Sequence, residues 1–155
     1  MIEESMRDIL GHPVLLSNLR TDEIEYIAGL METRNYHESE IIFEEGTPGN
    51  EFFIILSGSV LVRKKDNLGK EHQLTTISGG ECFGEMALID EKPRSAGVRA
   101  LEETRVAVLP RLAFLVLKKE NINLYCHMLE NIAVEFSGRL RNMDQKYVKL
   151  MNVIF

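Results

Sequence analysis

Residues 79–100 read Gly79-Gly-Glu-Cys-Phe-Gly-Glu-Met-Ala-Leu-Ile-Asp-Glu-Lys-Pro-Arg-Ser-Ala-Gly-Val-Arg-Ala100, and they determine how the rest of the chain is interpreted. They place one carboxylate, Glu85, and one guanidinium, Arg94, on either side of a short apolar run. Gly84 can adopt a positive φ, and residues 85–89 are long enough for about one helical turn. The stretch therefore predicts a tight glycine turn followed by a very short helix.

The residues after this turn are suited to hold an anion. Pro93 ends the helical turn, so Arg94 and Ser95 begin an extended segment whose side chains can donate to phosphate oxygens. Free N–H groups at the start of the turn favour negative charge as well. Glu85 would repel a phosphate unless a hydroxyl, such as that of a ribose, lay between them. A ligand that fuses ribose and phosphate in one ring, a 3′,5′-cyclic nucleotide, satisfies both Glu85 and Arg94.

These residues also carry a family resemblance. Phe83-Gly-Glu-Met-Ala-Leu-Ile89 followed by Pro93-Arg-Ser-Ala96 resembles the phosphate-binding cassette of cyclic nucleotide-binding domains. That family includes bacterial catabolite activator proteins and protein kinase regulatory subunits. The resemblance continues through Ile41-Ile-Phe-x-x-Gly46 and Phe53-Ile-Ile-Leu-x-Gly58-Ser-Val-x-Val62, and it covers roughly residues 13–140.

The resemblance implies a role for each matching residue. Glu85 would accept from the ribose 2′-hydroxyl, and Arg94 would pair with the cyclic phosphate, helped by Ser95 and the amides of Ala87 and Ala96. The full set of ligand-binding residues predicted in this way is Gly84, Glu85, Met86, Ala87, Arg94, Ser95 and Ala96. The simpler alternative is that Glu85 and Arg94 only pair with each other.

A pocket for the base is predicted at a second place. The resemblance implies that Val62, Leu74 and Ile77 line it, although ordinary core packing would explain these residues equally well. Arg139 is our candidate for stacking over the base or donating to a guanine edge, and a solvated helix arginine is the alternative. We expect cyclic AMP as the ligand. Cyclic GMP remains open, because no clear threonine and serine pair stands where the activator proteins contact adenine.

Composition limits the possible classes of protein. The 155 residues suit one domain, and a hydrophobic share of 45% with a charged share of 27% is typical of a soluble globular protein. No run is long enough to span a bilayer, and the acidic start is unlike a signal peptide. Cys82 and Cys126 lie far apart, which favours a reduced, cytoplasmic compartment. The net charge of −6 argues against a general affinity for nucleic acid.

The pattern of hydrophobic residues predicts an α+β, mainly β fold: an antiparallel β-roll, resembling a jelly-roll barrel, with N-terminal helices and a long C-terminal helix. Within an N-terminal helical segment, 1–32, a weak turn at 3–9 and a helix at 22–32 are expected. The roll, 33–109, contains the cassette at 79–100. The expected strands are 40–44, 52–57, 59–65, 71–78, 95–100 and 103–109. Residues 110–155 form the C-terminal helices, the first of which starts at Pro110 and ends near Lys119.

The last helix carries one long apolar stripe, and its members recur at intervals of three or four residues. They are Tyr125, Leu129, Ile132, Phe136, Leu140, Met143, Tyr147 and Leu150. A small roll cannot cover such a stripe, so we expect a homodimer through residues 125–150. The alternative is a monomer whose stripe folds against its own roll. Gly138 could mark a bend.

Other chemistries lack their motifs in this sequence. The four histidines, His12, His37, His72 and His127, show no paired ligand spacing, and no Gly-x-Ser-x-Gly elbow or Walker loop is present. We therefore expect a non-enzyme without metal or cofactor. The sequence stops at Phe155, whereas the activator proteins that it resembles continue into a helix-turn-helix domain, so we expect no direct DNA binding. We expect no membrane partner, because no run is long enough to span a bilayer. The competing hypothesis is a protein-interaction scaffold that uses this fold without a ligand.

Overall fold

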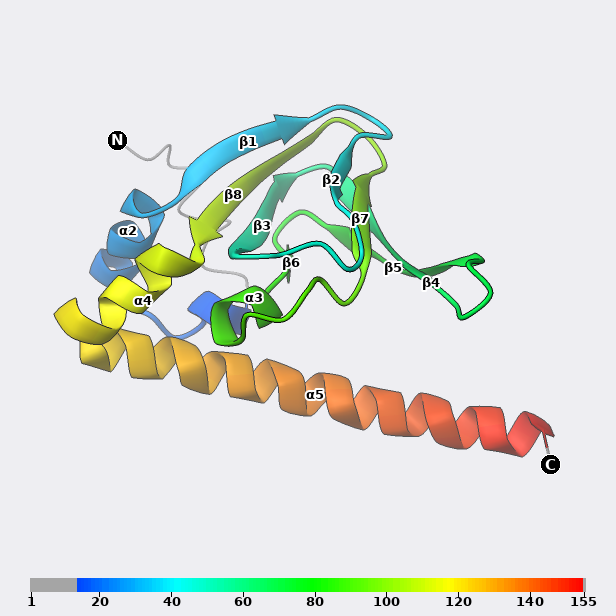
Figure 1. Ribbon diagram of the computed structural model, residues 1–155. Helices are drawn as coiled ribbons and strands as arrows, with labels where there is room; N and C mark the ends of the chain where they lie inside the picture. The colour runs from blue at the N-terminus through cyan, green and yellow to red at the C-terminus, as the bar shows by residue number, and fades with distance from the viewer. Residues whose placement is uncertain (1–13, 155) are drawn as a thin grey trace.

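The computed structural model describes residues 14–154, and the predicted turn at 3–9 lies outside them. An antiparallel roll sits above one long helix, α5, that runs beneath it (Figure 1). In chain order the elements are η1 (Val14–Leu16), α2 (Thr21–Gly29), β1 (Glu32–Tyr36), β2 (Ile41–Phe43), β3 (Glu51–Ser57), β4 (Ser59–Lys65), β5 (Glu71–Ser78), β6 (Cys82–Phe83), α3 (Met86–Ile89), β7 (Gly97–Ala100), β8 (Thr104–Pro110), α4 (Arg111–Glu120) and α5 (Ile122–Ile154).

The strands form two four-stranded antiparallel sheets. One has the order β1-β8-β3-β6 and the other the order β2-β7-β4-β5. The central pair of the first sheet, β3 and β8, places Phe53 opposite Val108, and the pair β4 and β7 of the second places Val62 opposite Val98. This confirms the predicted fold class, a mainly β roll with a long C-terminal helix.

Strands β3 and β8 are buried on both faces, which explains their unbroken apolar sequences. One face of the sheet, with Phe52 and Ile54, packs against the helices in one hydrophobic cluster. The other face, with Phe53 and Ile55, packs against the second sheet in another cluster. The molecule is thus layered as helices, first sheet and second sheet, and β5 at the edge of the second sheet is mostly exposed.

Most predicted boundaries agree with the structure to within two residues, and the differences have local causes. Helix α2 ends at Gly29 rather than at 32, because the chain turns there to enter β1. Strand β1 was missed, because Glu32-Thr-Arg-Asn-Tyr36 has no apolar run and lies on an edge. Strand β6 was missed because it has only two residues. Pro110 ends β8 and caps α4 instead of starting that helix.

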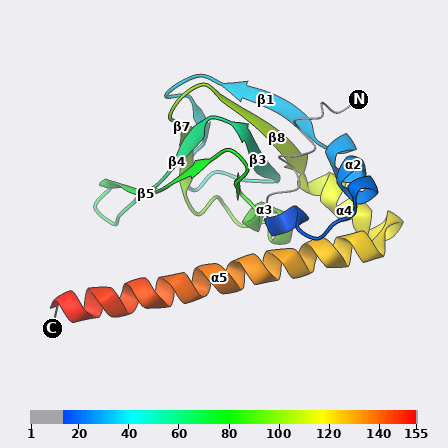
Figure 2. The same cartoon turned by 180° about the vertical axis from the view of Figure 1, so that it is seen from behind.

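Helix α5 continues through Gly138 without interruption, so the possible bend at that residue is not found. The first half of the apolar stripe, including Tyr125, Leu129 and Ile132, packs against the helical cluster. The second half is exposed, and Met143 and Tyr147 show 65% and 64% of their surfaces. Figure 2 shows that this second half continues beyond α3 and runs alongside the β4–β5 hairpin. No helix within residues 14–154 combines the length and hydrophobicity that a membrane crossing requires.

Candidate functional site

The predicted cassette folds around Gly84, where β6 turns into the short helix α3. Gly84 has φ +78°, a conformation that suits glycine. A Cβ atom at this position would lie 2.9 Å from Arg94 Nη1 and 3.1 Å from the carbonyl oxygen of Glu51. Glycine is therefore required both for the turn and for the close approach of Arg94.

The guanidinium of Arg94 is held from several sides. Its Nη2 donates to the carbonyl oxygen of Glu51 at 3.0 Å, and its central carbon lies 4.0 Å from the centre of the Phe43 ring. A Cβ on Gly49 would lie only 2.2 Å from Arg94 Nε, so the arginine rests directly on that glycine. Burial lowers the pKa of Arg94, although the negative charges of Glu51 and Glu85 oppose this.

Glu85 lies at the N-terminal end of α3 and is only 2% exposed. Its Oε1 pairs with Nη1 of Arg139, which projects from α5. The same guanidinium also binds Oε1 of Glu135, one helical turn earlier, at 2.5 Å. The second oxygen of Glu85, Oε2, is buried and has no hydrogen-bond partner among residues 14–154. One oxygen of Glu85, the predicted acceptor for a hydroxyl, is thus paired with α5, and the other accepts no hydrogen bond from the described part of the chain.

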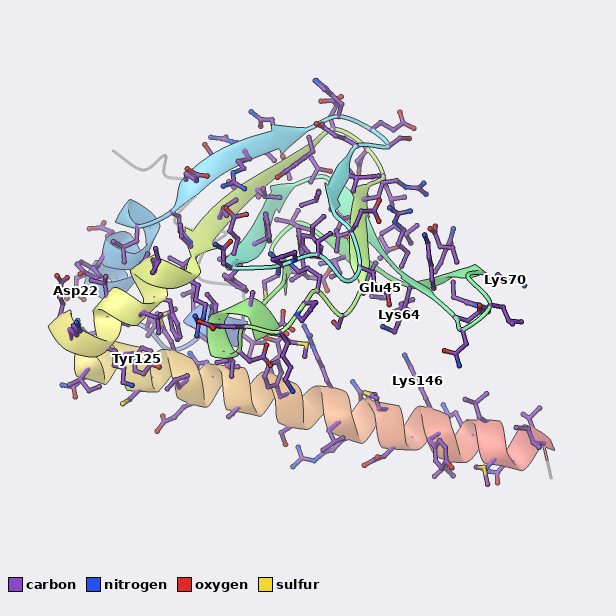
Figure 3. The ribbon with its side chains drawn as sticks, in the orientation of Figure 1. Asp22, Glu45, Lys64, Lys70, Tyr125 and Lys146 are labelled. Atoms are coloured by element: carbon purple, nitrogen blue, oxygen red, sulfur yellow. The ribbon has the colours of Figure 1, made fainter. Side chains whose placement is uncertain are left out.

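The remaining predicted cassette residues lie around these two charges. Ser95 is exposed, its hydroxyl lies 3.8 Å from the sulfur of Met86, and its carbonyl accepts from Lys64 Nζ at 2.5 Å. Lys64 Nζ also donates to Glu45 Oε1 at 2.8 Å, and the two residues lie beside each other (Figure 3). The amide of Ala87 donates to the Gly84 carbonyl at 3.1 Å, so it closes the turn rather than standing free. Ala96 is partly buried.

The four residues predicted to contact the base lie in three different places. Val62 and Ile77 are partly buried against the cluster between the two sheets. Leu74 is 52% exposed on β5. Arg139 lies on α5, and its guanidinium donates hydrogen bonds to the carboxylates of Glu85 and Glu135. A base pocket at these positions stays a prediction.

The simple pairing of Glu85 with Arg94 is not what the structure shows. Among the residues described, Glu85 forms its ion pair with Arg139, and Arg94 is held by a backbone carbonyl. The supporting residues Gly49 and Glu51 were not singled out from the sequence. The glycines and the proline in Gly46-Thr-Pro-Gly49 indicate only a turn, and nothing in the pattern around Glu51 indicates that its carbonyl supports an arginine.

One group near the site has the residue types of a metal centre. Ligand atoms of Cys82, Glu85 and Glu135 all lie within 4.8 Å of one another. Arg139 already supplies the positive charge beside the two carboxylates. Burial raises the pKa of the Cys82 thiol far above its usual value, with further contributions from the two acids. We therefore assign no metal to this group.

Comparison with known proteins agrees with this geometry. The sequence profile of the cyclic nucleotide-binding domain matches residues 33–121. The chain is 33% identical over 134 residues to the cyclic AMP receptor protein of Thermus thermophilus, and the aligned segment makes up 86% of this chain and 60% of that protein. It is 37% identical over 100 residues to a cAMP-dependent protein kinase regulatory subunit of Blastocladiella emersonii, and the aligned segment makes up 64% of this chain and 25% of that protein.

A solved structure shows the same likeness. The crystal structure of a cyclic nucleotide-binding domain from Methylobacillus flagellatus superposes with a TM-score of 0.82 and 26% identity, covering 92% of this chain and 80% of that one. The chain therefore belongs to the cyclic nucleotide-binding domain family, and the predicted resemblance is confirmed. It spans less than two thirds of the length of either sequence relative.

Proposed function

We propose that this chain is a regulatory sensor that binds a 3′,5′-cyclic nucleotide, with cyclic AMP as its ligand, and that α5 transmits the binding event. The family supports the class of ligand, and the names of the two sequence relatives support cyclic AMP. Arg94 would bind the cyclic phosphate, and Glu85 would accept from the ribose hydroxyl. We propose no catalytic activity and no cofactor.

The observation that carries this proposal is the state of the two charged residues in the cassette. Arg94 Nε and Glu85 Oε2 are both buried and both lack a hydrogen-bond partner within the described part of the chain. Burying a polar atom without a partner costs about 1–3 kcal/mol, so such atoms in a family ligand site point to a ligand that satisfies them. A phosphate and a ribose hydroxyl have the matching chemistry.

The signal would travel through the helices that flank the cassette. Helix α3 packs against both β3 and α4, and α4 packs against α5. Capture of the phosphate by Arg94 would draw the cassette inward, and α4 and α5 would repack in response. Only a difference in ligand affinity between the two arrangements can drive this change.

A homodimer through α5 forms part of the proposal. The exposed second half of the stripe, Leu140, Met143, Tyr147 and Leu150, presents apolar side chains that a second copy of the helix could cover. We propose a cytoplasmic location with no direct DNA or membrane contact. Any further protein partner would act through the helices.

Isothermal titration calorimetry tests the proposal directly. The chain is titrated with cyclic AMP, with cyclic GMP, and with 5′-AMP as a control that lacks the fused phosphate ring. Saturable binding of cyclic AMP in preference to the other two supports the proposal. Preference for cyclic GMP would overturn the ligand assignment, and binding of neither cyclic nucleotide would favour the protein-interaction scaffold.

A further inference from the structure

The backbone of the cassette is anchored on both sides of the peptide that joins Ser95 to Ala96. Before this peptide, the amide and the carbonyl of Arg94 each form a hydrogen bond of 2.8 Å with the loop at 46–47. After it, Gly97 begins β7 and pairs with β4. A planar peptide between two anchored segments can still turn about the single bonds on either side of it. Its orientation therefore depends on a further contact.

Lys64, on β4, supplies that contact. Its Nζ donates to the carbonyl oxygen of Ser95 at 2.5 Å and to Oε1 of Glu45 at 2.8 Å. Glu45 is held in turn, because its Oε2 accepts from the Lys65 amide at 2.9 Å. The ammonium group thus bridges the loop and the cassette, and the Ser95 carbonyl is fixed in the direction of Lys64.

The direction of this carbonyl decides where the next amide points. In a planar trans peptide the C=O and the following N–H point in opposite directions. Because the oxygen of Ser95 faces Lys64, the N–H of Ala96 faces away from it. This amide belongs to no helix or strand, and it donates to no backbone carbonyl among residues 14–154. It is therefore free to donate to a ligand.

We propose that Lys64 is a positioning residue for the phosphate site: it holds the Ser95 carbonyl so that the Ala96 amide, on the other side of the same peptide, donates to the cyclic phosphate. This inference rests on the proposed function and deepens it, because it names the contact that orients one of the phosphate donors predicted from sequence. Lys64 acts through the peptide and does not touch the ligand.

The contribution of Lys64 to binding would come from preorganisation. Without its ammonium group, the Ser95–Ala96 peptide would adopt other orientations in the ligand-free protein, and binding would have to restore one of them. The alternative is that Lys64 attracts the phosphate by its charge alone. The charges of Lys64 and Glu45 are 2.8 Å apart, so they largely cancel at the distance of a second site. The geometry therefore favours positioning over attraction.

Lys64→Met tests the proposal, because methionine keeps much of the length of the side chain and removes its charge and its donors. Lys70→Met is the matched control, since Lys70 is exposed at the far end of the same hairpin (Figure 3). Calorimetry measures the affinity of each variant for cyclic AMP. We expect Lys64→Met to weaken binding by about fivefold and Lys70→Met to change it by less than about twofold. The Lys64 side chain is half exposed, so the fold should survive its replacement, which thermal unfolding checks.

Nuclear magnetic resonance reports the orientation of the peptide itself. In the unaltered chain, the amide proton of Ala96 should move downfield when cyclic AMP binds, because it donates to an anionic oxygen. This movement should be smaller in Lys64→Met. The carbonyl carbon of Ser95 should change its chemical shift in the ligand-free variant, because it loses a hydrogen bond. Lys64→Arg can still donate to that carbonyl and should restore part of both the affinity and the Ala96 shift.

Other outcomes would overturn the inference. Undiminished affinity of Lys64→Met would mean that the Ala96 amide is oriented without Lys64. Equal losses in Lys64→Met and Lys70→Met would mean that the hairpin acts through its net charge. Weaker binding with an unchanged Ala96 shift would mean that Lys64 only supports the fold. If the unaltered chain bound no cyclic nucleotide, the proposed function would fail and this inference with it, a result distinct from normal binding that Lys64→Met leaves unchanged.

Discussion

Arg94 offers the most direct test of the site, because its effects on ligand affinity and on stability should separate. Under the proposed function, Arg94→Gln removes a charge-assisted phosphate contact worth about 1.5–3 kcal/mol, so affinity for cyclic AMP should fall by about 10- to 150-fold. The glutamine is shorter and uncharged, so it cannot replace a guanidinium that donates to two phosphate oxygens.

The stability of the ligand-free protein should change far less. The substitution removes the hydrogen bond to the Glu51 carbonyl and the contact with the Phe43 ring, each worth about 1 kcal/mol. It also removes a positive charge whose burial is unfavourable, as the lowered pKa of Arg94 indicates. These effects have opposite signs, and we expect the free energy of unfolding to change by less than about 1 kcal/mol.

Gly49→Ala provides a second way to perturb the same guanidinium. The added Cβ would lie 2.2 Å from Arg94 Nε, so the arginine must shift although its charge is kept. We expect a loss of affinity in the same direction as that of Arg94→Gln. Calorimetry measures the affinities, urea unfolding measures the stabilities, and Arg20→Gln, which alters an exposed arginine beside α2, is the control. Undiminished binding by Arg94→Gln would refute the assignment of the phosphate site.

Three other predictions follow from the structure. Iodoacetamide should modify the exposed Cys126 much faster than Cys82, because burial removes Cys82 from solvent and raises its pKa; mass spectrometry showing equal rates would contradict this. Burial is the main cause that raises the pKa of Glu135. The contribution of Glu135 to the stability of the fold is therefore present below the pKa that it has in the unfolded chain, and it is lost as the pH rises through the pKa that it has in the folded protein. Urea unfolding across pH should therefore show the unaltered protein losing stability relative to Glu135→Gln as the pH rises through this window, and parallel curves would count against it. Replacing Leu140 and Met143 with glutamate should convert a dimer to a monomer in light scattering without lowering the stability of the roll, because both side chains are exposed in the single chain; an unchanged mass would rule out this interface.

The sequence was sufficient for features that depend on neighbouring residues. Gly84, Glu85 and Arg94 lie within one short stretch. The glycine turn and the two opposite charges beside it could therefore be recognised without knowing the fold. The runs of Phe, Ile and Val predicted β3 and β8, because a strand buried on both faces must be apolar throughout. The regular spacing along α5 predicted one helix for the same kind of local reason.

Tertiary structure decided the features that join distant segments. The partner of Glu85 is Arg139, 54 residues away, and no local pattern in the sequence indicates this pairing. Packing against the roll also decided that the stripe is covered up to about Phe136 and exposed beyond it. A charged side chain is stabilised by whichever opposite charge the fold brings within reach. The sequence therefore identified the groups that could bind a ligand, and the packing of α5 decided which of them was joined to the helix.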